Sequence, residues 1–344
     1  MSRRRAVNMA DLARKAGVSI ASVSRALSDT PGVSDQTRRR IRELCAEMSY
    51  TVSPDASRLK RGTTDRVAVV VRHLDFWFYS SMLQGIMNSL RNTDLDVLLY
   101  QVATEQERQR FFEELPARRQ VDALIVVAFP ISDEEMRRLD LMDVAVVVAG
   151  GALGDHPHVR IDDVVAARQA VNHLILAGHE RIAMLNADSD WTLAYAPPVD
   201  RRRGFTAAMG DAGIRVDPEL IVEVPWGTTG GADGMNRLLS IDPPPTAVFA
   251  FSDEVAIGAL RSLRRAAVPV PAGMSVVGID DHPMAELSDL TTVRQPVQAQ
   301  GARAGQLVLD LLQGKAIETT HVTLPTNLVI RGTTAPPRAV PRSA

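Results

Sequence analysis

The sequence predicts a small all-α head followed by an α/β body that contains two doubly wound parallel sheets. Near the amino terminus, two short amphipathic segments are joined by a turn that contains a glycine. From residue 65 onward, runs of β-branched residues alternate with helical patterns, which is typical of buried parallel strands. The body has about 280 residues, more than one hydrophobic core usually supports, so we expect two subdomains.

Caps and spacing define the first two helices. Gly17 ends the first helix, where a left-handed C-cap is needed, and Ser19 offers its hydroxyl as the N-cap of the second. The packing stripes consist of Leu12, Ala13 and Ala16 on the first helix and Val23, Ala26 and Leu27 on the second. These two helices are expected to form a helix-turn-helix unit.

Small side chains, hydroxyls and one guanidinium remain on the outer face of the second helix. These residues are Ile20, Ala21, Ser22, Ser24 and Arg25. Such a face suits the major groove of DNA, because bulky side chains would keep the helix away from the base edges.

The distribution of charge favours the same partner. Residues 1–62 carry 13 Arg and Lys against 6 Asp and Glu, a net charge of +7. The rest of the chain carries 26 basic and 35 acidic residues, a net charge of −9. The head can therefore neutralise phosphates, whereas the body would be repelled by them.

A third helix is predicted to begin after Ser34. Its apolar face consists of Ile41, Leu44, Cys45 and Met48, at helical spacing. Cys45 is the only cysteine of the chain, which excludes an internal disulfide, and we interpret it as a small core residue. Farther along, Ser53-Pro54-Asp55 would begin a helix of one or two turns that Gly62 ends, or the segment is a Ser/Arg-rich linker.

The body is expected to alternate strands and helices. Strands are predicted at residues 67–71, 96–100, 123–127, 144–148, 159–161, 182–185, 221–224, 247–250 and 275–279. Helices are predicted near residues 78–91, 105–115, 164–177, 201–212, 229–239 and 254–266.

From about Asn8 to about Gly332 the chain resembles the LacI/GalR-type family of bacterial transcriptional repressors. The motifs that carry the resemblance are Asp11-Leu12-Ala13, Ala16-Gly17-Val18-Ser19 and Val23-Ser24-Arg25-Ala26-Leu27. The resemblance implies that Pro54 to Lys60 forms a hinge helix on operator DNA, with Leu59, between Arg58 and Lys60, wedged into the minor groove.

It also implies that Ile20, Ala21 and Arg25 read bases, and that Arg25 can bond a guanine through two hydrogen bonds. Ser19, Ser22 and Ser24 would then anchor phosphates, although capping and solvation are sufficient reasons for serines at these positions.

The body resembles a periplasmic sugar-binding protein whose chain crosses between two subdomains near Ile161, Gln295 and Pro325. The expected organisation is a head at 1–52, a hinge at 53–64, one subdomain at 65–161 with 296–324, a second at 162–295 with 325–332, and a disordered tail at 333–344.

Ligands of parallel sheets bind at the carboxyl ends of the strands, and therefore a small-molecule effector, a sugar or sugar derivative, is expected between the subdomains. The candidate contacts are Phe78, Tyr79, Arg201, Trp226, Asp253 and Asp280. Alternatives remain open, because Arg201 belongs to an arginine triplet and Asp281 stands beside Asp280.

No catalytic motif, metal-ligand spacing or cofactor fingerprint is present, so neither a catalytic site, a metal nor a cofactor is expected. The alternative is an enzyme that acts on sugars or nucleotides and carries an accessory DNA-binding head.

Without a signal peptide or membrane segment, the protein is expected to be cytoplasmic and to have no membrane partner. Because two-fold operator DNA needs paired heads, the protein is expected to act as a homodimer.

Overall fold

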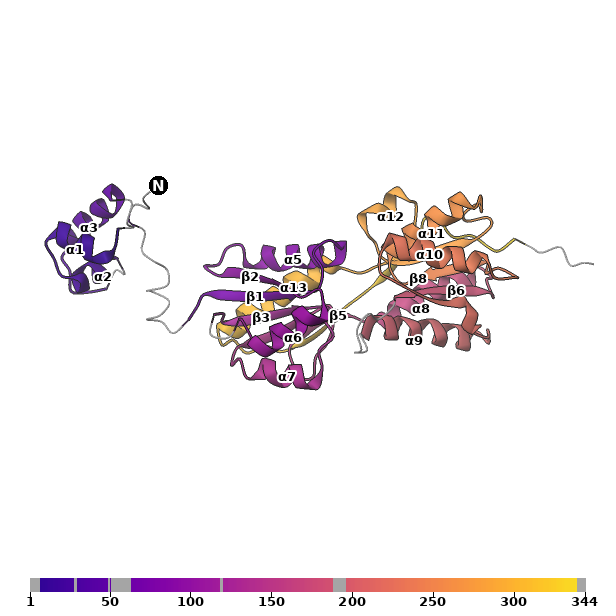
Figure 1. The fold of residues 1–344 in the computed structure, drawn as a ribbon, viewed down its shortest axis with the longest axis horizontal. Coiled ribbons are helices and arrows are strands. Elements are labelled where there is room, and N and C mark those ends of the chain that lie inside the picture. The colour runs from indigo at the N-terminus through magenta and orange to yellow at the C-terminus, as the bar shows by residue number, and fades with distance from the viewer. Residues whose placement is uncertain are drawn as a thin grey trace, which may run out of the picture. The chain divides into compact units, whose positions relative to one another are not determined.

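The computed structural model describes residues 7–27, 30–48, 50, 63–117, 120–187 and 196–338. The chain divides into two compact units, Met1–Thr64 and Asp65–Ala344. The first unit consists of helices and the second contains two mostly parallel sheets, so the predicted fold class is confirmed (Figure 1).

Three helices form the described part of the head. They are α1 (Met9–Ala16), α2 (Ile20–Leu27) and α3 (Asp35–Glu47). Gly17 ends α1 in the left-handed region with φ 69°. The Ser19 hydroxyl accepts a hydrogen bond from the Ser22 amide at 3.1 Å, and Ser34 caps α3 in the same way. The predicted caps are confirmed.

The core of the head is small. Leu12, Val23, Ala26 and Ile41 are fully buried within it. Cys45 is partly buried against this core, and burial raises the pKa of its thiol, as expected for a packing residue.

The body has two lobes, each built on one sheet. In the described residues, the sheet of the first lobe has six parallel strands in the order β11-β5-β4-β3-β1-β2. Its strands are β1 (Arg66–Val71), β2 (Asp96–Gln101), β3 (Ala123–Val127), β4 (Ala145–Ala149), β5 (His158–Ile161) and β11 (His321–Leu324). Its helices are α5 (Trp77–Leu90), α6 (Glu105–Glu114), α7 (Asp133–Asp140) and α13 (Val297–Leu312).

The sheet of the second lobe has the order β12-β10-β9-β8-β6-β7, with only β12 antiparallel among the described strands. Its strands are β6 (Ile182–Ala187), β7 (Ile221–Val224), β8 (Ala247–Ala250), β9 (Ser275–Asp280), β10 (Thr291–Arg294) and β12 (Asn327–Val329). Its helices are α8 (Asp163–Leu176), α9 (Ala196–Asp211), the 3-10 turn η1 (Pro218–Leu220), α10 (Thr228–Leu239), α11 (Asp253–Arg265) and α12 (Pro283–Leu287).

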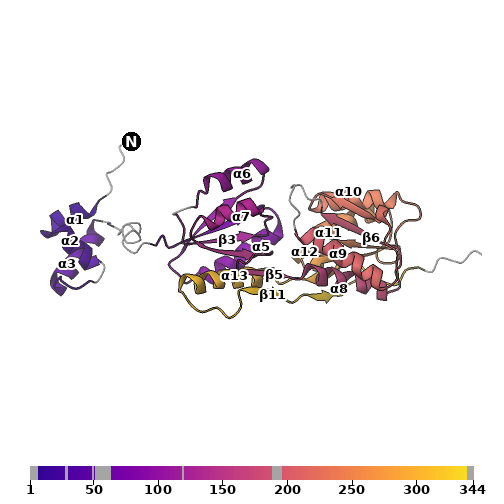
Figure 2. The ribbon, with the colours of Figure 1, turned by 90° about the horizontal axis from the view of Figure 1, so that it is seen from below.

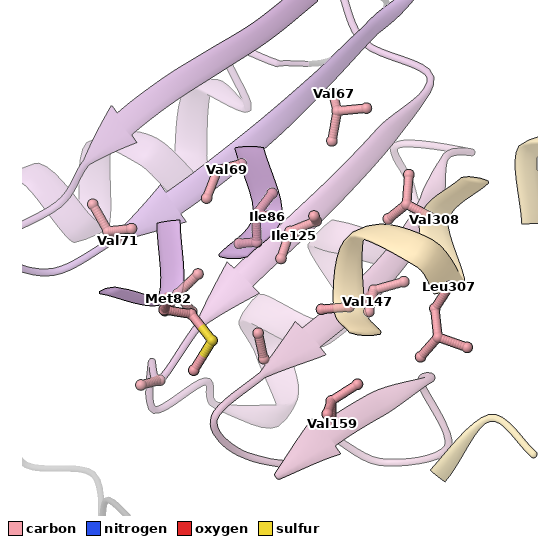
Figure 3. Close-up of a cluster of buried hydrophobic side chains, with 14 of the residues drawn as sticks. Val67, Val69, Val71, Met82, Ile86, Ile125, Val147, Val159, Leu307 and Val308 are labelled. Carbon is pink, nitrogen blue, oxygen red and sulfur yellow. The ribbon is translucent and has the colours of Figure 1, made fainter. Parts of the chain in front are cut away.

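Helices cover both faces of each sheet, as Figure 2 shows from a second direction. In the first lobe, α5 and α13 pack on one face and α6 and α7 on the other. The sequence of β1 is apolar throughout because the strand is buried on both faces. Val67, Val69 and Val71 face α5 and α13, while Ala68 and Val70 face α6 and α7. Figure 3 shows the hydrophobic cluster between this sheet and the helices α5 and α13.

Glycines bring α5 and α13 into close backbone contact. A Cβ atom on Gly85 would collide with the Gln298 carbonyl, and one on Gly301 would collide with the Met82 carbonyl.

Neither α13 nor α7 was predicted from the sequence. Helix α9 also begins at Ala196 and not near Arg201, because its two prolines occupy the first turn, where no backbone N–H is needed.

The chain passes between the lobes at three places. It leaves the first lobe between β5 and α8, returns between β10 and α13, and leaves again between β11 and β12. These connections place the ends of several strands from both lobes around one cavity.

Candidate functional site

The outer face of α2 is available to a partner. Ile20 is 52% exposed although it is apolar, and Ala21 and Arg25 are exposed beside it. Val23 and Ala26 on the opposite face are buried. The head therefore exposes the three side chains for which the family resemblance implies contact with bases.

The serines of this helix occupy its flank. The hydroxyls of Ser19 and Ser22 are 2.9 Å apart and hydrogen-bonded, Ser19 is exposed, and Ser22 and Ser24 are partly buried. Capping is thus one role of Ser19. The predicted hinge residues Arg58, Leu59 and Lys60 lie outside the described residues.

A small cavity lies between the two lobes of the body. It offers about 20 Å³ to the centres of water molecules, which is room for one or two waters. Its walls come from both lobes: Phe78, Gly150, Ile161, Asp163, Pro197, Arg201, Trp226, Phe251, Asp280, Gln295 and Gln300.

Arg201 of α9 is held rigidly in the wall of the cavity. Its side chain is only 4% exposed. The Nε atom donates to Asp163 Oδ1 at 2.8 Å, Nη1 donates to the Phe251 carbonyl at 2.5 Å, and the guanidinium carbon lies 4.4 Å from the Phe251 ring centroid. A guanidinium fixed in this way is a pre-organised donor.

A chain of amides leads from Asp280 to the other lobe. Gln295 Nε2 donates to Asp280 Oδ1 at 2.5 Å, and Gln300 Nε2 donates to Gln295 Oε1 at 3.2 Å. Asp280 ends β9 with φ 139°, a conformation that residues with a side chain rarely adopt. Strain of this kind occurs often at ligand sites.

Burial raises the pKa of the Asp280 carboxyl well above its usual range. The nearby Arg201 cation opposes this shift, and the Asp253 carboxyl adds to it. The cavity therefore contains a carboxyl group that the surrounding protein partly drives toward its neutral form.

Aromatic rings form the apolar part of the wall. Phe78 comes from the first lobe, whereas Trp226 and Phe251 come from the second, with ring centroids 5.0 Å apart in an edge-on arrangement. Together with the polar groups they give the mixture of ring faces and hydrogen-bonding atoms that binds small polar molecules.

Four of the six predicted contacts lie at this cavity: Phe78, Arg201, Trp226 and Asp280. Tyr79 does not line it, because it turns into the core from the inner face of α5 and its hydroxyl donates to the Ala128 carbonyl at 3.4 Å. Both residues belong to the first turn of α5, close to the predicted start of that helix.

Asp253 is also absent from the cavity wall. It is fully buried at the start of α11, where it accepts hydrogen bonds from the Thr292 hydroxyl at 2.6 Å and the His282 amide at 2.8 Å. The residue next to Asp280, Asp281, does not line the cavity either, and it is paired with Arg294 and Arg331.

Sequence reasoning missed four polar or aromatic wall residues: Asp163, Phe251, Gln295 and Gln300. Phe251 follows β8 and Gln295 follows β10, so the rule that ligands bind beyond the carboxyl ends of strands was a usable signal for both. Gln300 lies on α13, a helix that the sequence did not predict.

Within the described ranges, no group of His, Cys, Asp or Glu side chains is arranged to hold a metal ion. The helices in that part of the chain are also too short or too polar to span a membrane.

A helix-turn-helix head joined to a body of two parallel sheets is the architecture of a bacterial transcription regulator. Comparison with family models agrees: residues 8–53 match the bacterial regulatory proteins of the lacI family, and residues 171–334 match a periplasmic binding protein-like domain.

Similar proteins cover almost the whole chain. The HTH-type transcriptional repressor CytR of Escherichia coli (strain K12) is 33% identical over 342 residues, which are 98% of each chain. A complex of the transcriptional regulator CelR with cellobiose has a TM-score of 0.71 at 29% identity, covering 95% of this chain and 99% of that one. The Lac repressor dimer bound to operator and the anti-inducer ONPF has a TM-score of 0.83 at 25% identity, covering 96% and 100%.

The chain therefore belongs to the lacI family of bacterial regulatory proteins, and it is a DNA-binding transcriptional repressor. Its relatives are transcriptional regulators and not enzymes.

Proposed function

We propose that a small carbohydrate, bound in the cavity between the lobes, controls the affinity of the head for operator DNA. The observation that carries this proposal is that residues of both lobes form the cavity wall. Phe78 and Gln300 belong to the first lobe, whereas Arg201, Trp226 and Asp280 belong to the second. A ligand that contacts both sets changes the relative stability of the lobe arrangements.

The chemistry of the wall suits a sugar. The Arg201 guanidinium can donate to hydroxyl oxygens, the Asp280 carboxyl can accept hydroxyl hydrogens, and the rings of Phe78 and Trp226 provide apolar faces. The similarity to the CelR–cellobiose complex supports a carbohydrate.

The described arrangement is closed on this site, because a volume of about 20 Å³ is far smaller than a sugar. Ligand entry therefore requires the walls to separate. Because the ligand contacts both lobes, its affinity differs between the open and the closed arrangement, and regulation needs such a difference.

Contacts between the lobes converge on the cavity residue Trp226. Its indole N–H donates to Glu254 at 3.2 Å, and the other oxygen of Glu254 accepts from the Trp77 amide of the first lobe at 3.4 Å. The Phe76 ring of the first lobe lies 5.9 Å from the Trp226 ring. A ligand that displaces Trp226 would loosen these contacts and shift the lobes.

On the DNA side, the proposal assigns base reading to Ile20, Ala21 and Arg25 and phosphate contact to Ser19, Ser22 and Ser24. The segment with Arg58, Leu59 and Lys60 is proposed as the hinge that enters the minor groove, on the sequence resemblance alone.

A homodimer is proposed as the binding species, because two-fold operators require two heads. Its support is the similarity to the Lac repressor dimer. Leu287 of α12 is 78% exposed and Met284 beside it 45% exposed, so this helix offers apolar surface to a second copy.

The test measures fluorescence anisotropy of labelled operator DNA with the full chain and a panel of carbohydrates. One carbohydrate is expected to change the dissociation constant, and Asp280→Asn, which keeps the oxygen that Gln295 bonds, should remove that response while still binding DNA. An unchanged response in Asp280→Asn would contradict the assignment of the cavity.

A further inference from the structure

We propose that the effector is an uncharged molecule rich in hydrogen-bond donors, that sugar phosphates and sugar acids are rejected, and that Gln300 selects the accepted ligand. This inference rests on the proposed function and narrows it to a chemical class. Two independent observations carry it, the balance of charge around the cavity and an unsatisfied acceptor in its wall.

The first observation is that the cavity has no surplus positive charge. Among the described residues that line it, Arg201 is the only cation, and it faces two carboxyl groups, Asp163 and Asp280. Its salt bridge to Asp163 has an N–O distance of 2.8 Å, with both side chains largely buried. The single cation is therefore already neutralised before a ligand arrives.

Two further carboxyl groups lie close to Asp280. The carboxyl groups of Asp253 and Glu254 both act on Asp280 through space. A phosphate or carboxylate placed in this cavity would lose its hydration without gaining a free cation, which is strongly unfavourable.

The second observation concerns Gln300 of α13. Its side chain is 0% exposed and lines the cavity, and its Oε1 atom has no hydrogen-bond partner. Its Nε2 atom is already used in the bond to Gln295. The group that remains is thus an acceptor, and a buried acceptor without a partner is costly unless a ligand supplies the donor.

The position of this acceptor is fixed by the packing of α13. Gly301, the next residue, lies against the Met82 carbonyl of α5 so closely that a Cβ atom would not fit. Gln300 therefore stands on a rigid helix of the first lobe, across the cavity from Arg201 and Asp280 of the second. A ligand that bridges the lobes must present a hydroxyl or amino hydrogen to Gln300 while it bonds Asp280.

The first experiment compares neutral probes with their anionic counterparts. Calorimetric titration of the full chain would use cellobiose, D-glucose and D-ribose beside D-glucuronate, glucose 6-phosphate and ribose 5-phosphate. We expect a neutral sugar to bind, and its acid or phosphate to bind more weakly by about tenfold or more. Tighter binding of an anionic member would overturn the inference but leave a carbohydrate effector standing. Binding of none would overturn the proposed carbohydrate function, and this inference with it.

The second experiment tests Gln300 directly with the neutral sugar that binds. Gln300→Leu, and Gln300→Met as a variant of unbranched shape, should weaken binding by about tenfold or more. Gln298→Leu is the matched control, since Gln298 is exposed on the same helix and should bind as the wild type does. Without ligand, the Gln300 variants should unfold at an unchanged or higher temperature. Wild-type affinity in both Gln300 variants would refute the selective role.

Discussion

Replacing Arg201 by Met removes a buried cation but keeps an unbranched side chain of similar length. The substitution breaks the 2.8 Å bond to Asp163 and the 2.5 Å bond to the Phe251 carbonyl, and it leaves Asp280 without its compensating charge. Removing one partner of a buried ion pair lowers the free energy of unfolding by about 3–5 kcal/mol. We expect a loss at the lower end, about 3 kcal/mol, because the side chain of Asp163 is 13% exposed.

This cost should depend on pH in a definite direction. Burial already raises the pKa of Asp280, and loss of the Arg201 charge raises it further. The folded variant therefore binds a proton more readily than the folded wild type, so the difference in stability shrinks as the pH falls.

Urea unfolding at pH 8 and pH 5, followed by circular dichroism, measures both effects. Arg202→Met is the control, since Arg202 is exposed and its 3.3 Å contact with Glu223 is expected to contribute less than about 0.5 kcal/mol. A loss of less than about 1 kcal/mol in Arg201→Met at both pH values would refute the reasoning that the buried pair organises this wall.

Three further predictions follow from other parts of the chain. Burial raises the pKa of Asp253 to about 7, above its unfolded value, so the contribution of Asp253 to stability should fall as the pH rises from about 4 to about 7. Asp253→Asn should then gain stability relative to the wild type between pH 5 and pH 8 in urea unfolding, and a difference that does not change with pH, or that falls, would contradict this. Leu59→Ala should weaken operator binding by about tenfold or more in an anisotropy titration and leave effector affinity unchanged; equal operator affinity would remove its proposed wedge role. Arg25→Ala should cost about 1–3 kcal/mol on operator DNA and little on random DNA, and an equal loss on both would assign Arg25 to phosphates.

Much of the fold was predictable from the sequence because local signals and burial agree there. The β1 strand is apolar on both faces because helices cover both, and Gly17 and Ser19 mark the turn between α1 and α2 by their capping chemistry. The helix α13 escaped prediction because Gly301 and Gly305 interrupt its buried face, and its packing depends on a close approach to α5 that no local pattern reveals.

The cavity was predictable in part. Arg201, Trp226 and Asp280 follow from the ends of strands and from motif resemblance, and they do line it. Tyr79 follows the cavity residue Phe78, but helix geometry turns its side chain into the core. Asp253 lies two residues after the cavity residue Phe251, but it is fully buried and hydrogen-bonded to the Thr292 hydroxyl and the His282 amide. Gln300 could not be predicted as a wall residue, because such a prediction requires knowing that α13 packs on the first lobe. Only the three-dimensional arrangement supplies this information.

Genome-wide footprinting with the purified full chain, with and without neutral carbohydrates, tests most directly whether a ligand of the body governs the head. The account predicts protection at discrete two-fold symmetric sequences, and one uncharged carbohydrate that changes the protection in the wild type but not in Asp280→Asn. Protection that is the same with every carbohydrate, or equal at unrelated sequences, would contradict it.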